Sequence, residues 1–187
     1  MDCELLIEYL SKKNTISEKE KEIIKSTFVP LKIKKKEVLI NEFSQFNKLL
    51  FVTKGIMREY YINDNGKETI KIIAWENCFI INFKNITQNN KIIDCIEDAE
   101  ILCISHQEFE KLLQQFPNLK SIYIFILEEY YNLHIMSFQN LMSNDMAIKM
   151  QVFKKNFPAL INRVNDTILS SFLMISRETY VRNKKYL

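Results

Sequence analysis

The residues best suited to recognition chemistry lie at the end of the chain, in the stretch SRETYVRNKKYL at positions 176–187. Four of these twelve residues are Arg or Lys and one is Glu. In the major groove of DNA, an Arg side chain can donate two hydrogen bonds to guanine, and a Glu side chain can accept one from cytosine. The residue types therefore favour a DNA-reading segment. The alternative is a solvated basic chain end without a partner.

The spacing of the charged residues predicts which face of a helix they share. At 3.6 residues per turn, a helix places Arg177, Glu178 and Arg182 on one face, opposite the packing face. Ser176 can cap this helix, so the charged residues stand at the end that enters the major groove. Nearby hydroxyl and ammonium groups can bind phosphate. The candidate DNA-binding residues are Thr167, Ser176, Arg177, Glu178, Thr179, Arg182, Lys184 and Lys185.

A second short helix is expected to hold the reading helix in place. The segment NDTILSSFLMIS ends in a break near Met174 and Ile175, and its apolar residues can form a common core with Tyr180 and Leu187. From Asp145 onward the chain carries eight basic and three acidic residues, a net charge of +5, whereas the whole chain has a net charge of +3. A basic segment on a slightly acidic body suggests a polyanion as partner.

Upstream of these helices, the sequence predicts an α+β body. Positions 1–28 have a helical pattern, with a capping box at Ser17 and Glu20. Positions 31–104 contain short runs of β-branched and aromatic residues between turn signals, which are typical of an antiparallel β-barrel or sandwich. The pair Asn65-Gly66 predicts a tight two-residue hairpin turn, and Gly55 marks another bend. The segment IEDAEILCIS predicts one more strand pair.

A long helix is predicted from position 118 to about 142. Its apolar residues cover more of its surface than one domain needs to bury, which indicates a partner helix. The alternative is that the helix packs only on the body of its own chain.

The bulk composition limits the class of protein. Hydrophobic residues make up 47% and charged residues 26% of the chain, as in ordinary globular proteins. No apolar run is long enough to span a membrane, and the start of the chain does not resemble a signal peptide, so we expect a cytoplasmic protein. The four cysteines lack metal-ligand spacing, and we expect them to be small core residues. No catalytic arrangement and no metal site stands out, so we do not expect an enzyme.

Beyond these patterns, ISRETYVRNKKYL resembles the recognition helix of the Crp/Fnr transcription regulators. The stretch LLFVTKGIMREYYINDNGKETIKI resembles the β-roll hairpins of that family, and IEDAEILCISHQEFEKLLQQFPNL resembles its last strands and the helix before the dimer helix. The resemblance covers nearly the whole chain in order. It implies a β-roll sensor domain with N-terminal helices at 1–117, a dimerisation helix at 118–143 and a helix-turn-helix DNA-binding domain at 144–187. It also implies that Arg177, Glu178 and Arg182 read bases.

Two positions depart from the family pattern. Met174 stands where the turn usually has Gly, and Asn183 stands where the packing face usually has an apolar residue. Each departure is expected to cost about 1 kcal/mol, through a strained φ or a poorly satisfied polar group. Both put the DNA affinity in question and leave the predicted fold unchanged.

The nucleotide motif of the family is degenerate here. Members that bind cyclic AMP use a Phe-Gly-Glu stretch and a later Arg, but this chain has Phe79 followed by Ile80 and Ile81, with Lys91 nearest to the phosphate position. Lys lacks the bidentate fork of Arg. We therefore predict no cyclic AMP binding by the usual mode and no identified cofactor. The pocket residues in question are Phe79, Ile80, Ile81 and Lys91.

Together these observations predict a homodimeric regulator that binds double-stranded DNA, with the 118–143 helix as the dimer contact. The resemblance also makes RNA polymerase a candidate partner. The alternative function is a ligand-binding or protein-interaction module of the same fold that has lost DNA binding.

Overall fold

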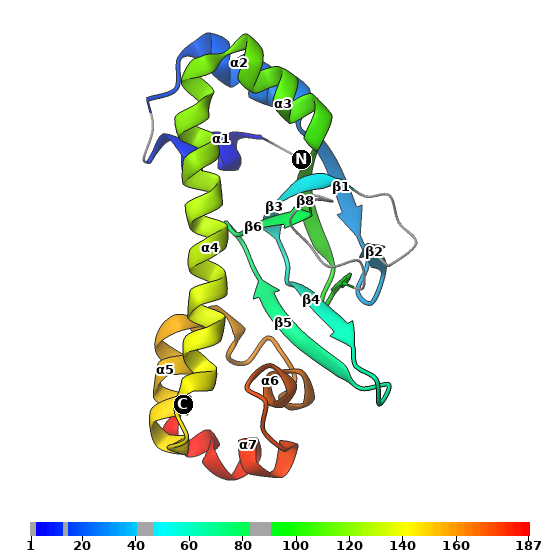
Figure 1. Ribbon diagram of the computed structural model, residues 1–187, viewed down its shortest axis with the longest axis vertical. Coiled ribbons are helices and arrows are strands. Elements are labelled where there is room, and N and C mark those ends of the chain that lie inside the picture. The colour runs from blue at the N-terminus through cyan, green and yellow to red at the C-terminus, as the bar shows by residue number, and fades with distance from the viewer. Residues whose placement is uncertain (1–2, 13–14, 41–46, 83–90) are drawn as a thin grey trace.

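A computed structural model describes residues 3–12, 15–40, 47–82 and 91–187, in which a β-roll lies beside one long helix with a helical unit at its lower end (Figure 1). Two helices precede the roll, α1 (Glu4–Ser11) and α2 (Glu18–Thr27). The predicted capping box opens α2: the Ser17 hydroxyl accepts from the Glu20 N–H, and the Glu20 carboxylate accepts from the Ser17 N–H at 2.8 Å. This pairing satisfies N–H groups that the helix start would otherwise leave open.

Two four-stranded antiparallel sheets form the roll within the described ranges, with strand orders β1-β8-β3-β6 and β2-β7-β4-β5. Side chains such as Leu49, Phe51 and Ile72 are fully buried in the hydrophobic core. The predicted α+β class with an antiparallel β-roll is confirmed. The strands are β1 (Val29–Ile33), β2 (Val38–Ile40), β3 (Lys48–Lys54), β4 (Met57–Ile62), β5 (Glu68–Ala74), β6 (Phe79–Asn82), β7 (Ile92–Cys95) and β8 (Ala99–Ser105).

The hairpin between β4 and β5 is longer than predicted. Ile62 and Glu68 are the last register partners, so positions 63–67 form the connection. The Asn63 N–H donates to the Lys67 carbonyl at 3.0 Å, and the Gly66 N–H donates to the Asn63 carbonyl at 2.8 Å. Of the predicted Asn65-Gly66 pair, Gly66 alone has a positive φ, at 72°. A type I′ turn needs two such residues, so the prediction of a two-residue turn was wrong.

The segment at 96–105 also differs from its prediction as a strand pair, because 96–98 is a turn and the rest is the single strand β8. This turn lies against Gly55, which has a φ of 94°, and a Cβ at Gly55 would come within 2.5 Å of the Asp98 carbonyl oxygen. The predicted bend at Gly55 is therefore confirmed, and its cause is a close backbone approach that a side chain would block.

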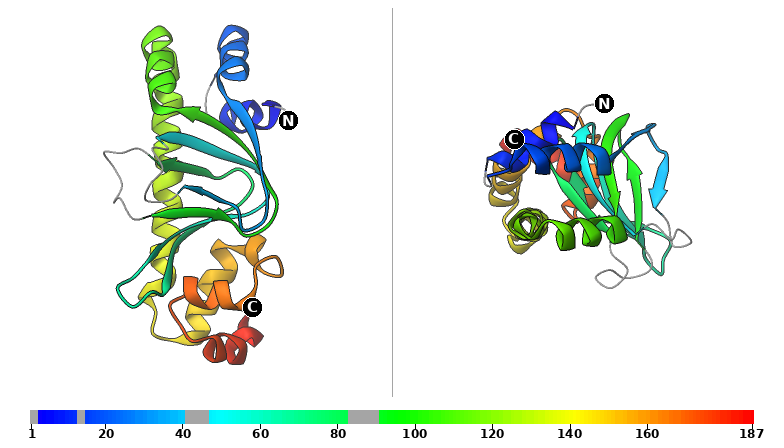
Figure 2. Two further views of the ribbon diagram at one scale, coloured as in Figure 1. Left: turned by 90° about the vertical axis from the view of Figure 1, so that its right-hand side faces the viewer. Right: turned by 90° about the horizontal axis from the view of Figure 1, so that it is seen from above.

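Three helical elements follow β8, with a non-helical residue, Phe116, after the first of them. They are α3 (His106–Gln115), the 3-10 turn η1 (Pro117–Leu119) and α4 (Lys120–Met142). The 23 residues of α4 confirm the long helix, and they run along the side of the roll from the α2 and α3 end to the α5–α7 end (Figure 2). Ile126 and Leu133 are buried on its inner face. None of the helices in the described ranges has the length and apolarity needed to cross a membrane.

The C-terminal unit is held by an aromatic core. The Phe157 ring lies 5.2 Å from that of Phe172 and 5.6 Å from that of Trp75, so the unit packs on the roll as well as on itself. Its elements are α5 (Met146–Asn156), η2 (Pro158–Leu160), α6 (Asp166–Phe172), α7 (Arg177–Asn183) and η3 (Lys184–Tyr186).

All four cysteines are free thiols, as expected from their spacing. Cys3, Cys95 and Cys103 are buried, and Cys78 is partly buried. Burial raises the pKa of Cys95 to about 12 and that of Cys78 to about 12, so both thiols are neutral at physiological pH.

Candidate nucleic-acid interface

The start of α7 is fixed by its cap. The Ser176 Oγ accepts a hydrogen bond from the Thr179 N–H at 3.0 Å, which is the N-cap contact predicted for this residue. Tyr180 is 1% exposed and anchors α7 in the core of the C-terminal unit. The cap and the anchor together set which face of the short helix is turned to solvent.

The solvent-facing side of α7 carries the predicted base-reading residues. Arg177, Glu178 and Arg182 are all exposed, and Val181 between them is 48% exposed. The Glu178 carboxylate accepts a hydrogen bond from the Glu178 backbone N–H, which lowers the pKa of this side chain. The carboxylate is therefore ionised at neutral pH and can accept hydrogen bonds. The structure therefore brings two donors and one acceptor together at the free end of the molecule.

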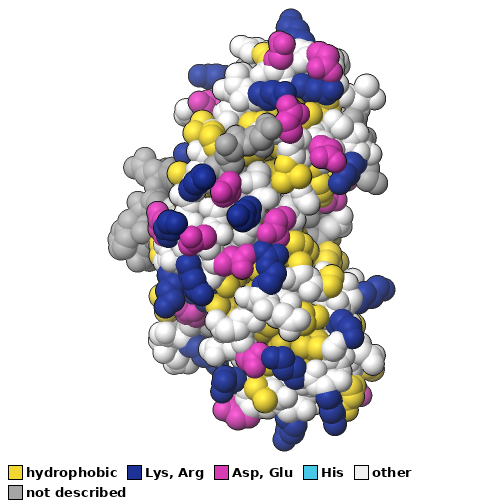
Figure 3. Space-filling view, turned by 180° about the vertical axis from the view of Figure 1, so that it is seen from behind, with side chains coloured by type: hydrophobic (Ala, Val, Ile, Leu, Met, Phe, Trp, Pro, Cys, Tyr) yellow, Lys and Arg dark blue, Asp and Glu magenta, His cyan; other side chains and the backbone are white. Residues whose placement is uncertain are grey.

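The residues predicted to contact phosphate differ in their exposure and in the partners they already have. Thr167 is exposed on α6, and the Ser176 hydroxyl donates to the Thr179 hydroxyl at 3.0 Å. The Lys184 ammonium is paired with Asp166 at 2.8 Å, which ties η3 to the start of α6. Lys185 is exposed, and its ammonium lies 5.2 Å from the Tyr186 ring centroid. Figure 3 shows Lys and Arg side chains at the lower end of the molecule, as well as on the body among acidic ones.

The turn between α6 and α7 shows the predicted strain. Met174 has a φ of 55° and is 63% exposed, so a residue with a Cβ occupies the left-handed region that Gly adopts freely. Asn183 is accommodated better than expected, because its Nδ2 donates to the Thr179 carbonyl at 2.8 Å. The polar group on the packing face therefore has a partner, and the cost of this departure is smaller than the sequence suggested.

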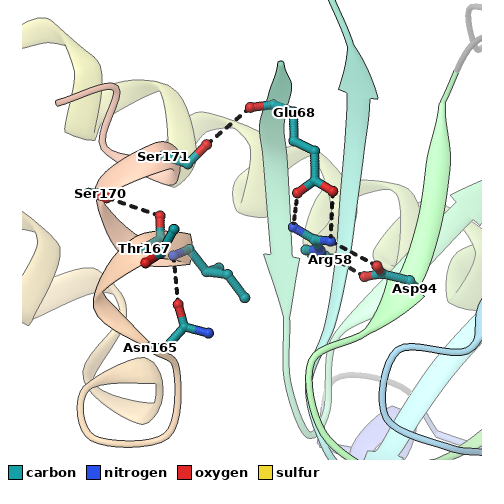
Figure 4. Close-up of polar contacts among 8 residues, drawn as sticks. Arg58, Glu68, Asp94, Asn165, Thr167, Ser170 and Ser171 are labelled. Carbon is teal, nitrogen blue, oxygen red and sulfur yellow. Dashed lines mark hydrogen bonds and ion pairs between the residues drawn. The ribbon is translucent and has the colours of Figure 1, made fainter. Parts of the chain in front are cut away.

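The β4–β5 hairpin supports α6 from the side of the roll. The Ser171 hydroxyl donates to the Glu68 carbonyl oxygen at 3.2 Å (Figure 4). The Glu68 carboxylate in turn accepts from Arg58 at 2.6 Å, and Arg58 also donates two hydrogen bonds to Asp94 at 2.8 and 2.9 Å. This chain of contacts links the C-terminal unit (α5 to η3), called the reading unit below after its predicted role, to the middle of the second sheet.

A second link joins the reading unit to the roll through Arg163, which lies between η2 and α6. Its guanidinium donates to both carboxylate oxygens of Glu76, at 2.9 and 2.8 Å, and also to Glu97. The hydrogen bond from Arg163 lowers the pKa of Glu76 to about 2. The sequence analysis did not single out this cluster, because Arg163 is separated from Glu76 by 87 positions and from Glu97 by 66.

The predicted ligand-pocket residues divide into core residues and one buried cation. Phe79, Ile80 and Ile81 are each 1% exposed, and as part of β6 they pair with β3 inside the roll. The Lys91 ammonium lies 3.3 Å from the Glu59 carboxylate and 3.2 Å from the Ile81 carbonyl oxygen. Burial lowers the pKa of Lys91, and Glu59, which is 1% exposed, opposes that shift.

These residues do not fit a cyclic nucleotide phosphate. An incoming phosphate would have to take Lys91 from Glu59 and leave that carboxylate buried next to a second anion, which is costly. The role of Glu59 was not predicted from the sequence. The available signal was a charged residue within a strand pattern, but its partner Lys91 lies 32 positions away. In the described ranges, no group of three or more His, Cys, Asp or Glu residues could hold a metal ion.

The outer face of α4 is apolar and open. Ile124, Tyr131 and Phe138 follow one another at seven-residue intervals and are 56%, 63% and 58% exposed, and Met142 continues the line at 70%. We call these four residues the α4 stripe. A seven-residue apolar repeat is typical of helices that pair in a coiled coil.

Comparison with known proteins gave matches at the level of structure. No protein-family model matches the chain, and no curated protein matches its sequence. FixK2 from Bradyrhizobium japonicum is similar with a TM-score of 0.73 and 11% identity, covering 85% of this chain and 83% of that one. A candidate crp/fnr-family transcriptional regulator from Eubacterium rectale has a TM-score of 0.68 and 14% identity, covering 91% and 83%.

A third similar structure is the c-di-GMP responsive global regulator CLP from Xanthomonas campestris. It has a TM-score of 0.66 and 14% identity, and the match covers 98% of this chain and 90% of that one. The β-roll, the long helix and the C-terminal helical unit are therefore shared in their order and arrangement. The chain has the fold of the Crp/Fnr regulators.

Proposed function

We propose that the protein is a sequence-specific DNA-binding transcription regulator of the Crp/Fnr type. The observation that carries this proposal is the exposed face of α7, where Arg177, Glu178 and Arg182 stand beside a capped N-terminus while Tyr180 anchors the other face. Arg and Glu in this position match the hydrogen-bonding groups of guanine and cytosine. Similar structures include proteins described as regulators, which supports the same function.

The proposal includes a homodimer formed through the α4 stripe. Four large apolar side chains exposed on one helix would gain from burial against a second copy. Two protomers would place their α7 helices about 34 Å apart, one turn of DNA, on a near-palindromic site. In this arrangement residues 1–117 form the sensor domain, 118–143 the dimer helix and 144–187 the DNA-binding domain.

The proposal assigns no catalytic step and no cyclic AMP to the β-roll. The Lys91–Glu59 contact supports this, since the cation closest to the expected phosphate position is already neutralised. A cytoplasmic location and RNA polymerase as a further partner belong to the same proposal.

Selection from a pool of random DNA duplexes tests the function without a known target. The full-length protein should enrich a near-palindromic sequence, and its affinity for that sequence should fall steeply with salt because phosphate contacts release counterions. A parallel selection with Arg182→Ala should lose information at one base position in each half-site. Lys111→Ala, an exposed change on α3 at the opposite end of the molecule, is the matched control.

A ligand-binding or protein-interaction module without DNA binding is the second candidate. It is favoured by the strained turn at Met174 and by the pairing of Lys184 with Asp166, which removes one phosphate contact. The module is the better assignment if the selection enriches no DNA sequence and if DNA binding is weak and does not depend on Arg177 or Arg182.

A further inference from the structure

A cleft on the flank of α4 is separate from the buried Lys91–Glu59 contact. Its volume is about 640 Å³, it is open to solvent on one side, and it is lined by α1, the β5–β6 connection with the start of β6, and the C-terminal half of α4. This volume lies within the range of small-molecule sites. The lining residues that matter for recognition are Tyr9, Trp75, Glu76, Phe79 and Glu129.

The charged residues that line the cleft are both acidic. Glu76 and Glu129 contribute carboxylates, Asn132 and Gln139 contribute amides, and among the described residues no Lys, Arg or His lines the cleft. Glu76 is already paired with Arg163, which is not a lining residue, so a phosphate or carboxylate ligand would chiefly meet the like charge of Glu129. A cation or a neutral hydrogen-bond donor would instead find acceptors.

The half-buried rings of Tyr9 and Trp75 give the cleft apolar walls, and the buried Phe79 supports Tyr9. Tyr9 packs on Phe79 with ring centroids 6.0 Å apart, and Trp75 is held edge-on by Phe157 at 5.6 Å. Aromatic faces bind planar apolar groups, and they also attract cations through the ring quadrupole. The walls are fixed by the cores of the roll and of the C-terminal unit, so the cleft is preformed.

The polar groups that line the cleft differ in whether they have a hydrogen-bond partner. The Tyr9 hydroxyl donates to Glu129, and burial together with this carboxylate raises the pKa of Tyr9. Asn77, which has a φ of 70°, also lines the cleft, and its Oδ1 is buried without a hydrogen-bond partner in the described part of the chain. The connection that carries Asn77 is therefore held in a strained form beside the cleft.

We propose that this cleft, the α1–α4 cleft, binds a small molecule with a planar apolar body and a neutral or cationic polar group. This proposal names the chemical class of the effector for the proposed regulator. A regulatory role of the cleft rests on that proposed function. Glu76 connects the two, because it lines the cleft and also accepts both hydrogen bonds from Arg163 of the reading unit. A ligand that engages Glu76 therefore competes with a contact that positions α6 and α7.

A charge series of one ring system tests the site on the full-length protein. Tryptamine, indole and indole-3-acetate share the indole body and differ in charge. Isothermal titration should show saturable binding of tryptamine and indole, with tryptamine at least about tenfold tighter than indole-3-acetate, as opposite and like charge near the Glu129 carboxylate require. Glu129→Gln should reduce this preference, whereas Glu128→Gln, the neighbouring exposed carboxylate outside the cleft, should leave it unchanged.

Met136→Trp, which adds volume inside the cleft, should weaken tryptamine and indole alike, with folding checked by circular dichroism. Equal binding of indole-3-acetate and tryptamine would overturn the proposal, as would the absence of saturable binding of both tryptamine and indole. If binding is absent and Met136→Trp also alters the sedimentation of the protein, the cleft is covered by a second subunit and the site is rejected. None of these titrations contains DNA, so a failure here is distinct from a failure of the DNA selection.

Discussion

The β-roll and α7 differ in whether their charged side chains are paired within the chain. In the roll, Arg58 is paired with Asp94 and Glu68, and Lys91 is paired with Glu59. On α7, Arg177, Glu178 and Arg182 face solvent beside one another. Internal pairing fixes a structure, whereas polar groups left at a free surface are available to a partner. The contrast fits the proposed roles, recognition by α7 and mechanical support by the roll.

The same comparison applies to the exposed apolar side chains of the α4 stripe. Substitutions there should have the largest effect of those proposed. Tyr131→Lys combined with Phe138→Lys should weaken the proposed dimer by at least about 4 kcal/mol, because both aromatic anchors are replaced by charges that repel their copies. Sedimentation equilibrium measures the change. Val29→Lys, an equally exposed apolar position on β1, serves as control, and a double variant that sediments like the parent would remove α4 from the interface.

Lys91→Met should destabilise the fold by about 3 kcal/mol, because it removes the buried partner of Glu59 and leaves this carboxylate with the half-exposed Lys71. Urea unfolding measures this loss, and Glu59→Gln added to Lys91→Met should recover part of it. Lys71→Met is the matched control and should cost less than about 1 kcal/mol. An equal cost for both lysine changes would show that Lys91 is not specially placed.

The sequence predicted local features well and distant contacts poorly. Helical spacing and residue type were enough to predict the cap at Ser176 and the packing position of Tyr180, and the family resemblance was enough to predict the strain at Met174. The contacts of Arg163 with Glu76 and of Lys91 with Glu59 join segments 87 and 32 positions apart, and only the packed sheets bring them together. The two-residue hairpin was a local prediction that failed, because Asn65 does not take the positive φ that it required.

Arg163→Gln tests the link between the two regions and should cost about 1 kcal/mol at neutral pH, as for a partly exposed ion pair. Arg163 lowers the pKa of Glu76 to about 2 in the folded state, below its ordinary value of 4.5. The stabilisation is therefore complete above pH 4.5 and is lost as the pH falls toward 2. The difference in unfolding free energy between parent and variant should shrink over this interval. A constant difference would mean that Glu76 is not the partner that matters.

Met174→Gly should give the smallest effect, a gain of about 1 kcal/mol, by removing the Cβ from a left-handed position. For a chain of this size, the gain corresponds to a rise in Tm of about 2–4 °C. Asn162→Gly, at a φ of 73°, is the matched control, and it should gain less because Asn adopts this region more readily. No difference between the two changes would show that the turn at Met174 is unstrained.

The central claim is that α7 reads DNA bases with side chains that do not support the fold. The most direct test is the affinity of Arg177→Ala for the selected duplex, measured by fluorescence anisotropy together with the free energy of unfolding. We expect the affinity to fall by about 1–3 kcal/mol, roughly 5- to 150-fold, and the free energy of unfolding to change by less than about 0.5 kcal/mol. Binding as tight as that of the parent protein would contradict the account.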